Sequence, residues 1–188
     1  LLATLENSYN FFALYANLDS WVPGSGEAEL TLLDKWIISR LNTVIAEVRE
    51  NNEAMNFTRA GKILSKFILD DLSNWYVRLS RRRFWKGEIN ADKQAAYGTL
   101  YTVLTESLKL LAPYIPFTTD EIYLSLNSDA ESVHLESFPE SESVLIDSEL
   151  ESIMSAAQSV VTLGRSLRQD SGIRTRQPLG TLLLHSED

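Results

Sequence analysis

The sequence predicts an all-α protein: an antiparallel helical bundle with a small extended appendage at its C-terminal end. Apolar residues recur at spacings of three and four along most of the 188-residue chain, which is the period of a helix with one buried face. Short breaks separate four long stretches of this kind, and short connections favour antiparallel neighbours. We expect three parts: the bundle over residues 1–127, an acidic linker with a short extended segment over 128–147, and a further helix with a terminal strand over 148–188.

The first two helices are separated by a loop rich in Gly and Pro. The first is predicted over about Leu2 to Leu18 and ends before residues 22–26, VPGSG. The second begins near Thr31, because Thr31 and Asp34 resemble a capping box in which Asp replaces the usual Glu. The Asn pair at 51–52 is expected to end it.

The third helix is the longest, and it is predicted from Asn56, a residue type common at N-caps, to about Lys86. Gly87 is a favourable stop, and the basic residues before it suit the negative end of the helix dipole. The expected buried stripe consists of Leu64, Ile68, Leu72, Trp75 and Leu79.

Capping residues and prolines set the limits of the fourth and fifth helices. Asn90 is expected to cap the fourth helix, and Pro113 and Pro116 to kink or end it. Thr118 with Glu121 predicts a capping box for a short fifth helix over about residues 119–126.

The C-terminal part is predicted to hold one more helix and a strand. Ser148 with Glu151 opens the helix, and the Ser-Gly pair at 171–172 ends it. Residues 179–185 are expected to form a strand. Because a lone strand leaves its backbone groups unpaired, its partner is either the segment Val133 to Phe138 or chain beyond residue 188.

Catalytic and metal-binding patterns are lacking. There is no cysteine, which excludes a disulfide scaffold, a cysteine-based zinc site and a thiol nucleophile. His134 and His185 are far apart, and no GxSxG or P-loop motif is present. Asp70 and Asp71 are adjacent on a helix, so their side chains diverge; a surface role, or ion pairs with Arg78 or Lys66, is favoured over catalysis. No apolar run approaches the roughly 20 residues of a membrane helix.

Charge is distributed unevenly along the chain. The net charge is −9, but residues 56–90 carry eight basic and three acidic side chains, so this segment is +5 and the rest is −14. Residues 129–151 contain eight acidic residues and no Lys or Arg. A basic stripe on an acidic body can bind a polyanion, while the acidic remainder limits indiscriminate binding.

The basic segment ends in residues 72–86, LSNWYVRLSRRRFWK, in which five of the last nine residues are basic. Helical spacing places Arg78 and Arg82 on one face with Lys86 below them, and Arg81 with Trp85 on a neighbouring face. Arginine forks match phosphate oxygens, and exposed aromatic rings stack on unpaired RNA bases. Trp75, Tyr76 and Phe84 are favoured as core residues. Because three consecutive arginines cannot all be buried, they form either a solvated face or a ligand site.

A second basic group lies near the C-terminal end and consists of Arg165, Arg168, Arg174 and Arg176. Arg174 and Arg176 alternate at the entry to the predicted strand, so both would point to one side. Surface charge and ligand binding explain this pair equally well. Arg40, in the second helix, is favoured as a salt-bridge partner.

Five segments together resemble one known family. Residues 34–42, DKWIISRLN, are similar to the start of the anticodon-binding helical domain of class Ia aminoacyl-tRNA synthetases, and residues 110–117 with 120–123, LLAPYIPF and DEIY, resemble a motif of that class. Three segments resemble its isoleucine branch: 72–85, 132–139 from SVHL to FP, and 164–179, GRSLRQDSGIRTRQPL. The resemblance covers nearly the whole chain in order. Its arginine-rich form is similar to the eukaryote-like subgroup, which also occurs in bacteria.

The resemblance implies a bundle of the class Ia anticodon-binding type that docks the anticodon stem and loop of isoleucine tRNA. It implies that a separate domain, whose His-Ile-Gly-His and Lys-Met-Ser-Lys-Ser signatures this chain lacks, activates isoleucine with ATP and magnesium. We expect a non-catalytic, monomeric and cytoplasmic module without a cofactor, in contact with catalytic and C-terminal domains outside the chain. The expected phosphate ligands are Arg78, Arg81, Arg82, Arg83 and Lys86, with Trp85 as a stacking surface and Arg174 and Arg176 as further candidates.

Two further expectations concern the nature of the chain. It lacks a starting Met and begins inside an apolar helical pattern, so we expect an internal piece of a longer protein. The alternative function is a helical scaffold whose basic stripe binds an acidic protein partner.

Overall fold

The described part of the chain is helical and contains no strand; it comprises residues 1–24 and 29–185 of the computed structural model. Its elements are α1 (Leu2–Leu18), α2 (Leu32–Glu53), α3 (Phe57–Lys66), the π-helix η1 (Phe67–Val77), α4 (Arg78–Trp85), α5 (Ala91–Leu111), α6 (Pro116–Leu126), the 3-10 turns η2 (Val133–Leu135) and η3 (Ser143–Leu145), and α7 (Ser148–Asp170). The all-α prediction is confirmed. Contacts divide the chain into two compact units, Leu1–Ser148 and Glu149–Asp188.

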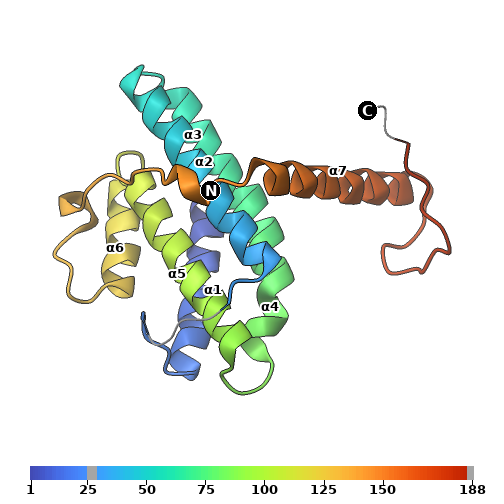
Figure 1. Cartoon of the computed structure of the whole chain (residues 1–188), viewed down its shortest axis with the longest axis horizontal. Coiled ribbons are helices and arrows are strands. Elements are labelled where there is room, and N and C mark those ends of the chain that lie inside the picture. The colour runs from blue at the N-terminus through green and yellow to red at the C-terminus, as the bar shows by residue number, and fades with distance from the viewer. Residues whose placement is uncertain (25–28, 186–188) are drawn as a thin grey trace. The chain divides into compact units, whose positions relative to one another are not determined.

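The first unit is a bundle with α2 and α5 at its centre (Figure 1). α2 packs against α3, η1 and α5; α1 packs against η1 and α5; and α6 packs against α5. The largest fully buried side chains are Trp36, Phe67, Tyr76, Phe84 and Tyr97, which come from α2, η1, α4 and α5. Burial of one large apolar side chain contributes about 1.5–3 kcal/mol, so these contacts hold η1 and α4 firmly against the bundle.

α3, η1 and α4 form one continuous helix over residues 57–85, which we call the composite helix. The backbone stays in the right-handed helical region at both junctions, with φ of −57° at Phe67 and −61° at Arg78. The long helix expected from Asn56 to about Lys86 is therefore present, but its middle part winds as a π-helix.

In the composite helix, side chains with no exposed surface recur at every fourth residue, with Phe67, Asp71 and Val77 buried beside them. The seven that recur are Ala60, Leu64, Ile68, Leu72, Tyr76, Ser80 and Phe84. In a regular α-helix each step of four residues overshoots a full turn by about 40°, so six steps would place Phe84 about 240° from Ala60. The wider i→i+5 turns of η1 remove much of this drift, so both ends of the helix face the core.

The predicted stripe was wrong beyond Leu72. Leu79 is 54% exposed and Trp75 is only partly buried, while Tyr76 and Ser80 take the core positions. At 3.6 residues per turn, positions 75 and 79 would face the core. With the wider turns of the π-helix, positions 76 and 80 face it instead.

Two predicted caps are confirmed. The Thr31 side chain accepts from the Asp34 backbone N–H at 3.3 Å, and the Asp34 carboxylate accepts from the Thr31 N–H at 3.0 Å. The Asn90 side chain accepts from the Lys93 N–H at 2.9 Å at the start of α5. Asn56 precedes α3 as expected, but its side chain makes no capping hydrogen bond.

Two other predicted boundaries were wrong. α2 continues through the Asn pair to Glu53, because the Asn51 side chain is buried and donates to the Glu47 carbonyl within the helix. α6 begins at Pro116 rather than near Thr119. Proline suits the first helical turn because its missing N–H has no helical partner there, so the Thr118–Glu121 capping box is not needed.

The segment 128–147 lies along the first unit and is held by side chains of α2 and α6. Asp120 accepts from the Ser132 hydroxyl at 2.7 Å and from the Val133 N–H at 2.9 Å, which shapes the turn η2. Asn42 accepts from the Glu142 N–H at 2.8 Å, and Ser39 accepts from the Asp147 N–H at 2.8 Å. The extended segment expected at Val133 to Phe138 was therefore wrong at its start, where a 3-10 turn forms.

The second unit contains α7 and the residues that follow it. α7 begins at Ser148 as predicted, and Gly172, with φ of +66°, lies just beyond its end. Arg168 donates to the carbonyls of Arg174 and Gln177, at 3.1 and 2.8 Å, across a turn. The strand predicted over 179–185 was wrong: this segment is irregular. A strand needs a neighbour for its backbone groups, and η2, the proposed neighbour, is a turn.

Candidate nucleic-acid interface

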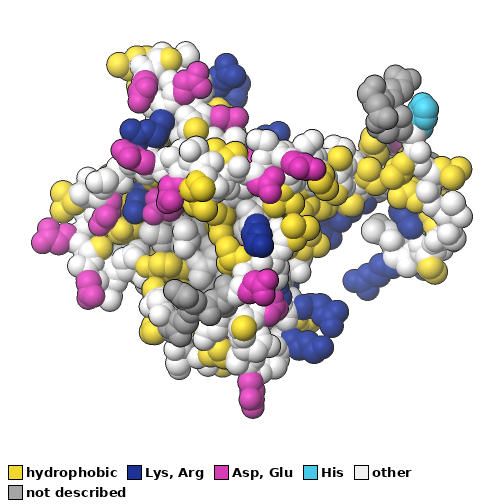
Figure 2. Space-filling model, in the orientation of Figure 1, with side chains coloured by type: hydrophobic (Ala, Val, Ile, Leu, Met, Phe, Trp, Pro, Cys, Tyr) yellow, Lys and Arg dark blue, Asp and Glu magenta, His cyan; other side chains and the backbone are white. Residues whose placement is uncertain are grey.

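α4 and the residue that follows it carry a group of exposed cations, Arg78, Arg81, Arg82 and Lys86. Within residues 1–24 and 29–185, no carboxylate lies within ion-pair distance of any of these four side chains. Figure 2 shows basic side chains gathered beside the lower end of α4. Unpaired guanidinium groups keep all their donors available for phosphate oxygens.

Trp85 is the last residue of α4 and is 65% exposed. It stands one turn after Arg81, so an exposed ring adjoins an exposed guanidinium group. Gly87 follows with φ of +76°, a left-handed conformation that ends the helix at this point. The arrangement offers a stacking surface next to phosphate-binding cations, which suits an unpaired nucleotide.

Arg83 differs from its neighbours because its donors are bound within the protein, which leaves it unavailable as the phosphate ligand that was predicted. Its side chain is only 14% exposed, and its two Nη atoms donate to Asp34 Oδ1 and Oδ2, each at 2.8 Å. Its Nε lies 2.9 Å from Asp92 Oδ1, and Nη2 also donates to the Asp92 carbonyl at 2.9 Å. Because the donors of its guanidinium group are occupied by Asp34 and Asp92, Arg83 holds α4 against the starts of α2 and α5.

Asp34 is the centre of this buried network. It is fully buried and also accepts from the Tyr76 hydroxyl at 2.6 Å. Burial raises the pKa of Asp34, but hydrogen bonds from Arg83, Tyr76 and Thr31 and the Arg83 charge outweigh it, so the pKa lies below its ordinary value. Burial and the Asp34 charge raise the pKa of Tyr76 well above 10.0. Asp34 therefore stays ionised and Tyr76 stays protonated as its donor.

A second network holds the turn after α4. Lys93 is buried and forms an ion pair with Asp19, and its ammonium group donates to the Gly87 carbonyl at 3.3 Å. The Tyr97 hydroxyl also donates to Asp19. Both networks fix the backbone on the two sides of residues 81–86, so the exposed cations extend from a rigid support.

Aromatic contacts complete the support beneath α4. Phe84 is fully buried, with ring-centroid distances of 5.1 Å to Phe11 and 5.0 Å to Tyr97. The expectation that Tyr76 and Phe84 belong to the core is confirmed, while Trp75 lies at its edge. Arg40 forms the expected salt bridge, at 3.5 Å to Asp71. No local pattern indicates that Asp34 binds Arg83 rather than Arg82.

Arg174 and Arg176 are exposed in the second unit. They lie in the turn that Arg168 holds, with the Arg174 carbonyl accepting from the Gln177 N–H at 2.9 Å. The prediction that the two side chains alternate along a strand was wrong, because no strand forms there. Their role in RNA binding stays a prediction.

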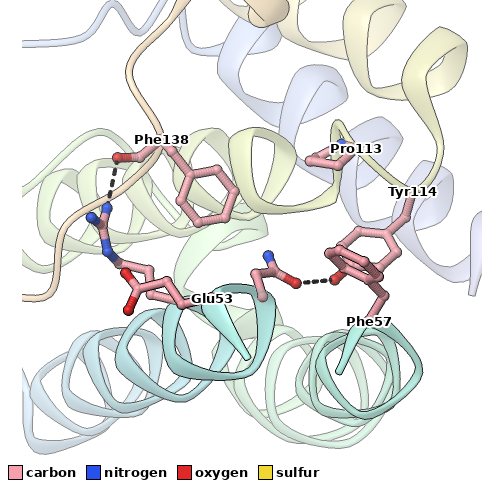
Figure 3. A pocket seen from close by; sticks show the side chains of 7 residues that line it. Glu53, Phe57, Pro113, Tyr114 and Phe138 are labelled. Carbon is pink, nitrogen blue, oxygen red and sulfur yellow. Dashed lines mark hydrogen bonds between the residues drawn. The ribbon is translucent and has the colours of Figure 1, made fainter. Parts of the chain in front are cut away.

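A hollow of about 520 Å³ lies at the far end of α2 from Asp34, lined by Arg49, Asn52, Glu53, Phe57, Pro113, Tyr114 and Phe138 (Figure 3). The Tyr114 hydroxyl donates to Asn52 at 2.7 Å, and Arg49 donates to the Phe138 and Pro139 carbonyls at 3.4 and 2.9 Å. Glu53 is the single acidic residue of this lining. The hollow therefore offers no pair of carboxylates among its lining residues.

The described residues also bear on metal binding and on membrane insertion. Those residues contain no group of three or more His, Asp or Glu side chains arranged to hold a metal ion. Nor does any helix in the described ranges combine the length and apolar character needed to cross a membrane.

Comparison with known proteins identifies the family. The family described as "Anticodon-binding domain of tRNA ligase" matches residues 34–183. The chain belongs to this family. The exposed cations of α4 thus lie on an anticodon-binding domain, and a scaffold for acidic proteins is not favoured.

Relatives of this anticodon-binding domain are isoleucine–tRNA ligases. The chain is 47% identical to that of Cytophaga hutchinsonii over 96% of its length, 46% identical to that of Porphyromonas gingivalis over 98%, and 46% identical to that of Thermoplasma volcanium over 98%. It spans only 16–18% of the length of these relatives. The resemblance to the isoleucine branch is confirmed.

Proposed function

We propose that this chain is the tRNA-docking module of an isoleucine–tRNA ligase, and that the end of α4 meets the anticodon stem and loop of isoleucine tRNA. The observation that carries the proposal is the contrast within one helical turn: Arg81 and Arg82 are exposed and unpaired among the described residues, while Arg83 is locked onto Asp34. The locked residue fixes the direction in which the exposed ones extend.

The chemistry divides between two kinds of contact. Arg78, Arg81, Arg82 and Lys86 neutralise phosphates, which supplies affinity without reading sequence. Trp85 supplies a flat surface for a base of the unpaired loop. A preformed support reduces the conformational entropy lost on binding, which favours affinity from few contacts.

The remaining parts of the proposal concern the whole protein. The ATP- and magnesium-dependent attachment of isoleucine to tRNA belongs to domains outside this chain, with which the bundle is in contact. The protein is monomeric and acts in the cytoplasm. The module itself holds no cofactor and performs no chemical step.

The test is a binding titration with isoleucine tRNA. The variant Arg78→Gln/Arg81→Gln/Arg82→Gln removes three cations and should weaken binding by more than tenfold in 0.15 M salt, since each phosphate contact contributes about 0.7–0.9 to the log–log salt slope. Its circular dichroism should match that of the unmodified chain, because all three side chains are exposed. Lys35→Gln, which changes an exposed lysine of α2, serves as the control. Unchanged binding of the triple variant would contradict the proposal.

A panel of tRNAs addresses recognition. Isoleucine tRNA should bind more tightly than a version whose anticodon loop is closed into a paired stem if Trp85 contacts the loop, whereas exchanged anticodon bases should bind almost equally, because stacking accepts any base. Equal binding of the RNA without an unpaired loop would leave a general stem-docking surface and contradict the contact with the loop.

A further inference from the structure

The outward side of the composite helix carries its own series of residues, spaced by four. Lys62, Lys66, Asp70, Asn74, Arg78, Arg82 and Lys86 are all exposed. From Lys62 to Arg82, each stands two positions after one of the fully buried residues, Ala60 to Ser80, and Lys86 follows Phe84 in the same way. The series, which we call the outward ridge, therefore lies opposite the core along the whole helix.

The π-helix is what brings the two ends of this ridge to one side. Lys62 and Arg82 are 20 residues apart, and in a regular α-helix of 3.6 residues per turn they would be about 160–200° apart around the axis, on opposite sides. The wider turns of η1 reduce this angle, as the four-residue recurrence of the buried series shows independently. The lysines of α3 are therefore aligned with the arginines of α4.

The ridge is strongly cationic over its length. It holds five cations and one carboxylate, Asp70. In the ranges that the structure describes, Lys62 and Lys66 have no carboxylate within ion-pair distance. Lys62 and Lys86 are 24 positions apart, a span of roughly 36 Å at the α-helical rise of 1.5 Å per residue, which is longer than contact with a hairpin loop alone requires.

We propose that the outward ridge is an extended phosphate-binding surface, on which Lys62 and Lys66 of α3 contact the double-stranded stem of the RNA whose loop meets the end of α4. This inference rests on the proposed function, which places RNA at α4, and adds a second contact region to it. Lysine is a compact point charge on a flexible stem and suits contacts with phosphates without regard to sequence, whereas the arginine forks of α4 suit directed contacts.

The first experiment compares two double variants with a control. Lys62→Gln/Lys66→Gln should weaken binding of isoleucine tRNA by about tenfold in 0.15 M salt and reduce the size of the log–log salt slope by about 1.4–1.8. Arg78→Gln/Arg82→Gln should reduce the slope by a similar amount. Lys35→Gln, an exposed lysine on α2 that is outside the ridge, should leave the slope unchanged.

The second experiment changes the ridge in the opposite direction. Asp70→Asn removes its single carboxylate, which is exposed, and should tighten binding. Asp70→Lys adds a cation and should increase the size of the slope by about 0.7–0.9. An RNA trimmed to the loop and its closing base pairs should bind the lysine double variant and the unmodified chain equally.

The outcomes separate this inference from the proposed function. A loss with the arginine variant but none with the lysine variant would refute the extended ridge and leave RNA docking at α4. No loss with either variant would refute both. The ridge would also be refuted if Lys62→Gln/Lys66→Gln weakened binding of the trimmed RNA as much as it weakens binding of the whole tRNA. That result would place the two lysines at the loop.

Discussion

Replacing Arg83 by Met tests the division of labour within the arginine triplet. Asp34 is fully buried and Arg83 is 14% exposed, so the substitution leaves a buried carboxylate without its cation. Removal of one partner of a buried pair typically costs about 3–5 kcal/mol. Because the Tyr76 and Thr31 hydroxyls still donate to Asp34, we expect the lower end, about 3 kcal/mol. For a chain of this size that corresponds to a Tm lower by about 6–12 °C.

Chemical denaturation and RNA titration of the same variants give the two readouts. Arg82→Met, at the neighbouring exposed position, should change the free energy of unfolding by less than about 0.5 kcal/mol while reducing the RNA salt slope by about 0.7–0.9. Arg83→Met should show the reverse pattern: lower stability and an unchanged slope at temperatures where it is folded. The reasoning would be refuted if Arg83→Met kept its stability and lost the same part of the slope as Arg82→Met.

Three further predictions concern single residues. Trp85→Ala should lower the affinity for isoleucine tRNA by about 1–3 kcal/mol if a base stacks on the ring, with little effect on Tm; equal affinity would exclude stacking. Because the pKa of Asp34 is lowered, its carboxylate stabilises the folded state at pH values above 3.8, the ordinary pKa, and this stabilisation is lost as the pH falls through the pKa of the folded state. The free energy of unfolding of Asp34→Asn should therefore decline less steeply below about pH 4. An unchanged decline would contradict the network. Gly87→Ala should lower the free energy of unfolding by about 1–2 kcal/mol because φ is +76° there. Gly98→Ala, in the interior of α5 with open space where the Cβ would lie, should raise it by about 0.5–1 kcal/mol. A destabilising Gly98→Ala would show that the two positions differ for another reason.

Local signals allowed most of the helices to be predicted from the sequence. The reciprocal hydrogen bonds of Thr31 with Asp34 and the cap of Asn90 depend on residues within three positions, so their sequence patterns are sufficient. Gly87 and Gly172 end helices as expected because both adopt positive φ. The family could be inferred because its motifs recur in order along the chain.

The phase of the composite helix could not be predicted. Pattern matching assumes 3.6 residues per turn, and with that assumption Leu79 belongs to the core. A π-helix has no comparable sequence signature, and it moves the core to Tyr76, Ser80 and Phe84. The same shift decides that Arg83 faces inward and Arg82 outward, so the site could be located to one helix end but not resolved among its arginines.

Long-range partners explain the other failures. Asp34 and Arg83 are 49 residues apart, and their pairing depends on how α2, α4 and α5 meet. The strand expected over 179–185 depended on a neighbour that the sequence did not identify. Interactions across such separations follow from the packing of whole elements rather than from local patterns.

Hydroxyl-radical footprinting of isoleucine tRNA on this chain tests most directly whether the end of α4 is the RNA-facing side. We predict protection of the sugars of the anticodon stem and loop, and loss of the loop protection with Arg78→Gln/Arg81→Gln/Arg82→Gln. Protection confined to other parts of the tRNA, or an unchanged footprint with the triple variant, would contradict this assignment.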